Sequence, residues 1–185
     1  MTHVAEALTR ALGPDRVQPS VSLAPMTTFR VGGPAPALDG PMIPFPTGQA
    51  TVRVLPGPQD DYFAGDALEV LQSAPYVIAQ NSDRMGFRLA GPVLAHSRGA
   101  DIISDATPLG VLQVPASGQP ILLMADRPTA GGYPKIATVI SADMAVAGQL
   151  SPGDSILFRV CTPRDAMAAL IAQERFVMAV ERWNQ

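Results

Sequence analysis

Nineteen prolines and sixteen glycines are scattered along this 185-residue chain, and they restrict its fold more than any other feature. Both residue types interrupt helices and strands, because proline lacks a backbone donor and glycine is conformationally free. They are dispersed and not periodic, which excludes a collagen-like chain. Short apolar runs separate them, and this pattern is typical of a β-rich fold with many turns.

The charge pattern excludes two broad classes of protein. Hydrophobic residues make up 47% of the chain and charged residues 16%, with a formal net charge of −3. A disordered chain carries far more charge and far fewer apolar residues than this. The arginines stand singly along the sequence, so there is no basic patch for a phosphate backbone, and we expect no nucleic-acid partner.

The sequence also carries no signal for a membrane, a secretion route or a metal. No apolar run approaches the roughly 20 residues of a membrane-spanning helix, and the first residues lack the pattern of a secretion signal. We therefore expect a cytoplasmic protein without a membrane contact. The single cysteine, Cys161, excludes an internal disulfide, and His3 and His96 have no partner at a ligand spacing, so we expect no metal site.

Changes in sequence pattern divide the chain into three predicted segments. Residues 1–33 form an N-terminal appendage that opens with a short amphipathic helix at 3–13. Residues 34–48 are too rich in proline for a helix or a central strand, and we predict a linker. Residues 49–185 carry the alternating patterns and are predicted to form the folded domain.

The folded domain is predicted to be mainly β. The predicted strands are 50–57, 76–80, 86–91, 110–115, 120–126, 135–143 and 155–161. A short helix is predicted at 62–74 with Asp60 or Asp61 as its cap, and a turn at 145–154. A long helix is predicted to begin at Thr162, Pro163 and Asp165. Strands and helices never alternate regularly, which favours a small barrel or sandwich over a parallel doubly wound sheet.

The only lysine of the chain, Lys135, follows a glycine pair and a proline. A P-loop is excluded, because the residue directly before the lysine is proline and not glycine, and the residue directly after it has no hydroxyl. The backbone of Thr129, Gly131 and Gly132 is a candidate anion-binding loop, since glycine lets a ligand approach closely. Tyr133 and Lys135 would then add a hydrogen bond and a point charge. The alternative is an ordinary turn with a solvated lysine.

Two further polar groups interrupt the apolar strands. Asp83 and Arg84 lie in a predicted turn, where Arg84 either grips a ligand carboxylate or forms a local ion pair. Gln113 and Gln119 flank the connection between two predicted strands, and strand alternation places Gln113 on the same face as Val111. A buried glutamine needs partners for its amide, and these are either backbone groups or an amide or ureido ligand.

Five motifs occur in one order, and the match they define covers about residues 51–159. They are VRVLPGPQDDYF, QNSDRMGFRLAGP, GADIISD, LQVPASGQPILLMADRPTAGGYPKIATVISAD and QLSPGDSILFRV. Together they resemble the C-terminal half of the biotin-dependent carboxyltransferase-like family. That family includes the C subunit of bacterial ATP-dependent 5-oxoprolinase, the kinase-inhibitor antagonist proteins of bacilli and the carboxyltransferase part of urea amidolyase.

The resemblance implies a cyclophilin-like β-barrel with a short internal helix and a C-terminal helix, working with a partner subunit. An oxoprolinase assembly opens 5-oxoproline to glutamate with ATP, and an amidolyase moves a carboxyl group from carboxybiotin to urea. We therefore expect a small carboxylate or amide substrate, with ATP in the assembled complex and biotin as the alternative cofactor. The candidate substrate-binding residues within the motifs are Asp83, Arg84, Gln113, Gln119, Tyr133 and Lys135.

The same resemblance leaves other functions open. A non-catalytic regulatory module of the kinase-inhibitor antagonist type and an inactive fragment are the alternatives, since the family's N-terminal half is expected to be missing. Pro128 stands where the family usually has glutamine, and Ala106 where it usually has glycine. Residues 23–35, LAPMTTFRVGGPA, resemble the start of UDP-N-acetylenolpyruvoylglucosamine reductase, but its flavin-binding segments are not present and we expect no flavin.

Overall fold

The computed structural model describes residues 17–19, 29–31 and 46–183. The chain divides into two units, Met1–Met42 and Ile43–Gln185. The first unit contains a two-stranded antiparallel ribbon of β1 (Val17–Pro19) and β2 (Phe29–Val31). The predicted helix at 3–13 and nearly all of the predicted linker lie outside the described residues, so the proposed segment boundaries stay a prediction.

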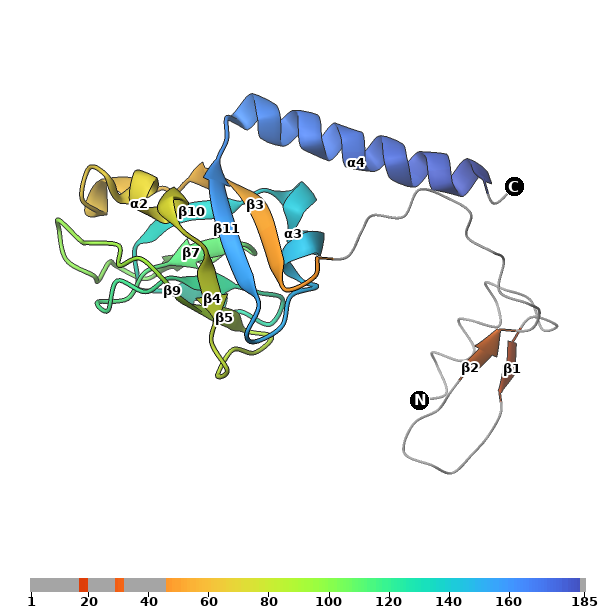
Figure 1. Ribbon diagram of the computed structural model, residues 1–185, viewed down its shortest axis with the longest axis horizontal. Coiled ribbons are helices and arrows are strands. Elements are labelled where there is room, and N and C mark those ends of the chain that lie inside the picture. Colours follow the sequence, from red (N-terminus) through yellow and green to blue (C-terminus); the bar gives the residue numbers. More distant parts are fainter. Residues whose placement is uncertain (1–16, 20–28, 32–45, 184–185) are drawn as a thin grey trace. The chain divides into compact units, whose positions relative to one another are not determined.

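The second unit is a closed barrel of seven strands in the order β10-β3-β11-β4-β5-β8-β7 (Figure 1). Neighbouring strands are antiparallel, except that β11 and β3 run parallel through six residue pairs. The mainly β barrel that the sequence predicts is therefore confirmed. The strands are β3 (Gln49–Pro56), β4 (Tyr76–Ile78), β5 (Gly86–Ala90), β7 (Val111–Gln113), β8 (Ile121–Leu123), β10 (Lys135–Val139) and β11 (Ser155–Val160).

Alternating side chains of these strands fill the barrel. On β3 the residues that face inward are Ala50, Val52 and Val54, and every second residue faces out. The ring of Tyr76 meets the ring of Phe158 edge to face at the centre of the core, 5.7 Å between centroids. Burial raises the pKa of the Tyr76 hydroxyl to about 12, and this hydroxyl donates to the Pro92 carbonyl.

The segment after β3 differs from the predicted helix at 62–74. A short 3-10 helix, η1 (Asp60–Tyr62), comes first, and the α-helix α2 (Ala67–Ser73) begins only after Asp66. Neither Asp60 nor Asp61 caps α2, so that prediction was wrong. The chain stays extended at Phe63, because this residue pairs with His96 and their rings stack 4.9 Å apart.

A helix that was not predicted, α3 (Ser141–Ala147), replaces the end of the strand predicted at 135–143 and the first residues of the turn predicted at 145–154, and the strand ends at Val139. The reason is a tertiary contact. Asp143, in the first turn of α3, accepts hydrogen bonds from the backbone N–H and the guanidinium of Arg53 on β3, at 2.6–2.9 Å. The carboxylate is the main reason that the pKa of Arg53 is raised.

The C-terminal helix begins as the sequence predicts. α4 (Pro163–Trp183) starts with proline, and Thr162 and Asp165 bond to each other's backbone N–H groups and side chains in a capping box. These hydrogen bonds lower the pKa of Asp165. Among the described residues, no helix is long and apolar enough to cross a membrane.

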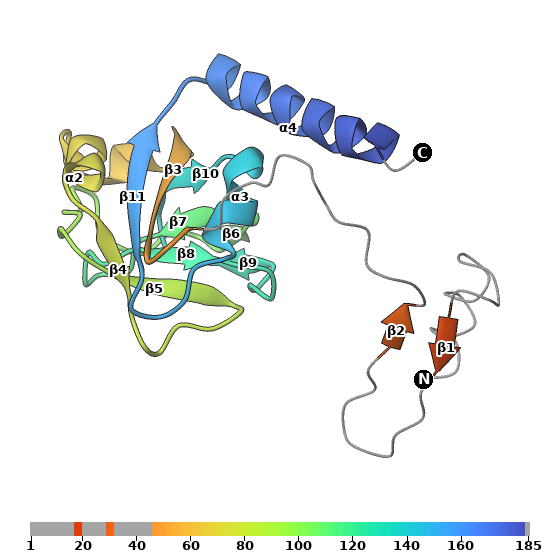
Figure 2. The same cartoon turned by 45° about the vertical axis from the view of Figure 1, so that its right-hand side comes forward.

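A second, short ribbon lies on the barrel near β7 and β8 (Figure 2). It consists of β6 (Asp105–Ala106) and β9 (Ala130–Gly131), paired antiparallel. Two hydrogen bonds extend the pairing, from Ile102 N–H to the Gly132 carbonyl and from Thr107 N–H to the Thr129 carbonyl. The β6–β9 ribbon therefore brings Asp105 over the outer face of the barrel.

Candidate functional site

Two polar side chains lie side by side on the outer face of the barrel. Lys135 on β10 pairs with Gln113 on β7, so both point to the same face. Their neighbours Leu112 and Ile136 belong to the core. Lys135 and Gln113 lie outside that core, yet they are only 1% and 4% exposed. The β6–β9 ribbon supplies contacts to both side chains.

The Lys135 ammonium is held by a carboxylate of the ribbon. Lys135 Nζ lies 2.8 Å from Asp105 Oδ2, and the side chain of Asp105 is about half exposed. The ammonium, followed by the Ala106 N–H, lowers the pKa of Asp105. Gln59 joins the same group, because its amide oxygen accepts from the Lys135 N–H at 3.3 Å and its side chain adds a small contribution to the lowered pKa of Asp105. We call Gln59, Asp105, Gln113 and Lys135 the lysine cluster.

Gln113 closes the lysine cluster on its other side. Its amide nitrogen donates to the Tyr133 carbonyl over 3.5 Å, a long hydrogen bond. A Cβ at Gly131 would lie 2.6 Å from that nitrogen and 3.1 Å from the Thr107 methyl group. Only glycine therefore lets β9 lie this close to Gln113.

The structure brings together one part of the predicted site. Gln113, Tyr133 and Lys135 lie with the candidate anion loop, whose residues Thr129, Gly131 and Gly132 form β9 and its flanks. The Thr129 and Gly132 carbonyls bond to the strand opposite, so this segment is one side of a ribbon and not an open phosphate cradle. A ligand anion would reach Lys135 only by displacing Asp105 or by moving the ribbon, since the lysine itself is buried.

The other predicted site residues have partners of their own. Asp83 accepts from the Met85 and Gly86 N–H groups in a turn, at 2.8 and 3.2 Å. Arg84 forms an exposed ion pair with Asp126 at 2.8 Å. Gln119 accepts from the Gly91 N–H and donates to the Gly91 carbonyl, at 2.9 and 3.0 Å. Their contact with a substrate stays a prediction.

The sequence reasoning missed two residues, Asp105 and Gln59. A lone lysine inside a β-branched strand needs an acidic partner once it is buried, and this requirement was the available signal for Asp105. No signal marks Gln59, because its place depends on the path of the chain after β3. Within residues 46–183, no group of three or more His, Cys, Asp or Glu side chains could hold a metal ion.

The two departures from the family pattern fit the ribbon. Ala106 lies in β6. Among the described residues only glycines take a positive φ, so the backbone at Ala106 is in a region that alanine adopts without strain. The carbonyl of Pro128 accepts a hydrogen bond from the Thr107 hydroxyl. Proline therefore keeps the acceptor that the ribbon uses at this position.

Fold and site together define a class of protein, a closed β-barrel domain whose polar cluster lies outside the core and under a short ribbon. The family model described as carboxyltransferase domain, subdomain A and B, matches residues 11–160 of the chain. The chain belongs to this carboxyltransferase family. The matched range includes the segment that resembles the reductase, and that second resemblance stays a prediction.

Individual proteins are similar to parts of this chain. The C subunit of 5-oxoprolinase from Escherichia coli (strain K12) is 38% identical over 125 residues, which are 68% of this chain and 40% of that protein. The C subunit of 5-oxoprolinase from Haemophilus influenzae is 36% identical over 131 residues, 71% of this chain and 42% of that protein. The chain thus spans about two fifths of these curated relatives.

A solved structure supports the fold. The crystal structure of the K. lactis urea amidolyase covers 88% of this chain and 10% of its own, with a TM-score of 0.67 and 24% sequence identity. At this identity the similarity concerns the fold alone. It agrees with the closed barrel described above.

Proposed function

We propose that this chain is one part of a partner-dependent, ATP-dependent 5-oxoprolinase that opens 5-oxoproline to glutamate. The curated relatives at 38% and 36% identity are named as C subunits of 5-oxoprolinase, and the chain spans only two fifths of them. The remaining parts of the site are therefore assigned to partner chains or segments. ATP as a cosubstrate would place the assembly in the cytoplasm.

The single observation that supports a substrate role is the burial of two members of the lysine cluster, Lys135 and Gln113. Among the described residues, an ammonium with 1% exposure and one carboxylate partner lies beside an amide with a single, long hydrogen bond. A 5-oxoproline molecule carries a carboxylate and a lactam, which match a cation and an amide. We assign the carboxylate to Lys135, once Asp105 moves aside, and the lactam to Gln113.

We do not assign the binding of ATP to this chain. Residues 129–132 form one side of the β6–β9 ribbon, and the sequence there lacks the P-loop pattern, so they do not fit a triphosphate. We assign ATP to the partner. The second candidate function is carboxyl transfer to an amide substrate, which the description of the matching family favours.

Reconstitution tests the proposal. The chain is mixed with candidate partner subunits, and ATP hydrolysis that depends on 5-oxoproline is measured. Lys135→Met and Gln113→Leu are expected to abolish this hydrolysis while the complex still forms. Arg98→Gln, in an exposed ion pair with Asp61, is the matched control and is expected to keep it. Arg84→Ala separately tests the predicted second contact to the substrate anion.

Two outcomes would overturn the assignment. Full turnover by the Lys135→Met complex would remove the lysine cluster from the reaction. Carboxylation of urea or another amide without any effect of 5-oxoproline would replace oxoprolinase by carboxyl transfer. Complex formation without any turnover would favour the regulatory module.

A further inference from the structure

Lys135 on β10 and Gln113 on β7 begin a row of outward-facing side chains. This row continues across two more strands, β8 and β5. Gln113 on β7 pairs with Ile121 on β8, and Ile121 pairs with Arg88 on β5. Paired residues of neighbouring antiparallel strands share a face, and their neighbours Leu122 and Phe87 point into the core. Arg88 therefore lies on the same outer face as Lys135, three strands away, at a separation of about 14 Å.

A hollow of about 210 Å³ lies at the arginine end of this row. Its walls are largely apolar, and the residues that line it are Arg88, Leu89, Pro115, Ser117, Gln119, Pro120 and Ile121. Pockets that take drug-sized ligands begin at about 300 Å³, so this hollow suits a small molecule.

The wall of the hollow is fixed in place. The loop between β7 and β8 contains two prolines, and Gly118 takes a positive φ of 73° with its N–H on the Pro115 carbonyl. Both polar atoms of the Gln119 amide bond to Gly91, so this amide has its partners in the backbone. The hollow is therefore preformed, and Arg88 is the one charged residue among those that line it.

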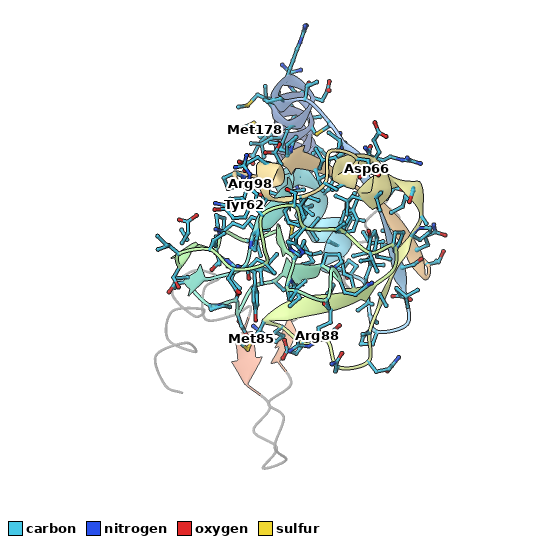
Figure 3. The ribbon with its side chains drawn as sticks, turned by 90° about the vertical axis from the view of Figure 1, so that its left-hand side faces the viewer. Tyr62, Asp66, Met85, Arg88, Arg98 and Met178 are labelled. Atoms are coloured by element: carbon cyan, nitrogen blue, oxygen red, sulfur yellow. The ribbon has the colours of Figure 1, made fainter. Side chains whose placement is uncertain are left out.

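Three arginines of the described chain, Arg53, Arg84 and Arg98, each pair with an aspartate. Arg127 and Arg159 donate to backbone carbonyls instead, and neither lines the hollow. Among the described residues, Arg88 pairs with no carboxylate, and its side chain donates only from Nε to the Asn81 carbonyl, at 3.3 Å. Figure 3 shows Arg88 at the lower side of the barrel in that view. Among the described residues, neither of the two terminal nitrogens of the Arg88 guanidinium donates a hydrogen bond.

We propose that this hollow binds a small carboxylate with an apolar body. The carboxylate takes the fork of Arg88 in a bidentate contact, and the body packs on Pro120 and Ile121. A single cation with apolar walls matches a singly charged ligand better than a phosphate, which needs more donors. This site is separate from the proposed 5-oxoproline contact at Lys135 and adds a second anion position to the same row.

A binding experiment on the whole chain tests this site without any partner. Cyclopentanecarboxylate is the probe, because it carries one carboxylate on an apolar ring and has no lactam. The isotope-labelled chain is titrated, and amide shifts are followed by nuclear magnetic resonance. We expect shifts at Leu89, Ser117 and Ile121. The uncharged cyclopentanecarboxamide is expected to bind about tenfold more weakly or not at all.

Variants assign the contact. Arg88→Gln keeps the length of the side chain without its charge and is expected to weaken binding about tenfold or more. Arg88→Lys is expected to recover part of the affinity, since it restores the charge without the fork. Arg98→Gln is the control and is expected to bind like the parent. Melting curves check that each variant is folded.

Several results would overturn the proposal. These are equal affinity of Arg88→Gln and the parent, equal affinity for the carboxamide, shifts centred on Lys135 and Gly131, and tighter binding of inorganic phosphate. Oxoprolinase turnover has no part in this experiment. A failure here leaves the proposed function standing, and a failure of reconstitution leaves this site standing.

Discussion

Lys135 and Asp105 form an ion pair with unequal burial, and this inequality predicts which partner controls stability. The side chain of Lys135 is 1% exposed and that of Asp105 is 52% exposed. Replacing Asp105 by alanine leaves a buried ammonium without its carboxylate. Replacing Lys135 by methionine leaves a carboxylate that water already reaches. We therefore expect Asp105→Ala to be the more damaging change.

The size of the effect follows from the burial of the ammonium. Removing one partner of a fully buried pair costs about 3–5 kcal/mol. Because water reaches the Asp105 side of this pair, it can solvate the stranded ammonium in part, and we expect a loss of about 2 kcal/mol. That loss corresponds to a fall in Tm of about 4–8 °C for a chain of this length.

Lys135→Met is expected to stay within about 1 kcal/mol of the parent, since an apolar residue of similar volume replaces a buried ion at little cost. The double variant is expected to recover most of the loss caused by Asp105→Ala. The assay is urea unfolding at neutral pH, followed by circular dichroism. Arg98→Met and Asp61→Ala provide the matched exposed pair, and each is expected to change stability by less than about 1 kcal/mol.

Two results would refute this reasoning. If Asp105→Ala is as stable as the parent, the ammonium does not depend on that carboxylate. If Lys135→Met is the more damaging of the two, the lysine contributes through packing of its methylene chain and not through its charge. A double variant less stable than both single variants would point to the same packing role.

Three further predictions concern single elements. Thr162→Ala removes half of the capping box and is expected to cost about 1 kcal/mol, read as an earlier loss of helical circular dichroism on heating. The pKa of Asp165 is lowered below its ordinary value of 3.8, so its stabilising contribution is present above that pH and disappears as the pH falls further. Asp165→Asn should therefore flatten the dependence of Tm on pH below 3.8, and an unchanged slope would contradict the assignment. Gly131→Ala places a Cβ 2.6 Å from the Gln113 amide and is expected to cost about 1–3 kcal/mol in urea unfolding. Gly65→Ala meets nothing within 4 Å and should unfold like the parent.

Most strands were predictable because they are short apolar or alternating runs with a proline or glycine close to one end. β3 is the clearest case, with Ala50, Val52 and Val54 inside the barrel. Helix α3 was not predictable from its own seven residues, because they lack a side-chain cap and follow a strand directly. Asp143 fixes this helix through Arg53, which is ninety positions away in the sequence.

The candidate site was predictable in its residue types but not in its contacts. Lys135 attracts attention as the only lysine, and the sequence favoured a solvated or ligand-binding charge there. Its burial and its pairing with Asp105 depend on the β6–β9 ribbon, whose strands have two residues each and no detectable pattern. The role of Arg88 depends on strand register, which a single sequence does not give.

The parallel pairing of β3 and β11 has a consequence for the synthesis of this protein. The first and last strands of the barrel are partners from Gln49–Ser155 to Val54–Val160, about a hundred residues apart along the chain. Contacts of such long range form slowly, and β3 has an open edge until β11 has left the ribosome. The nascent barrel is therefore expected to stay open, and to need protection from aggregation, until the chain has been made through Val160.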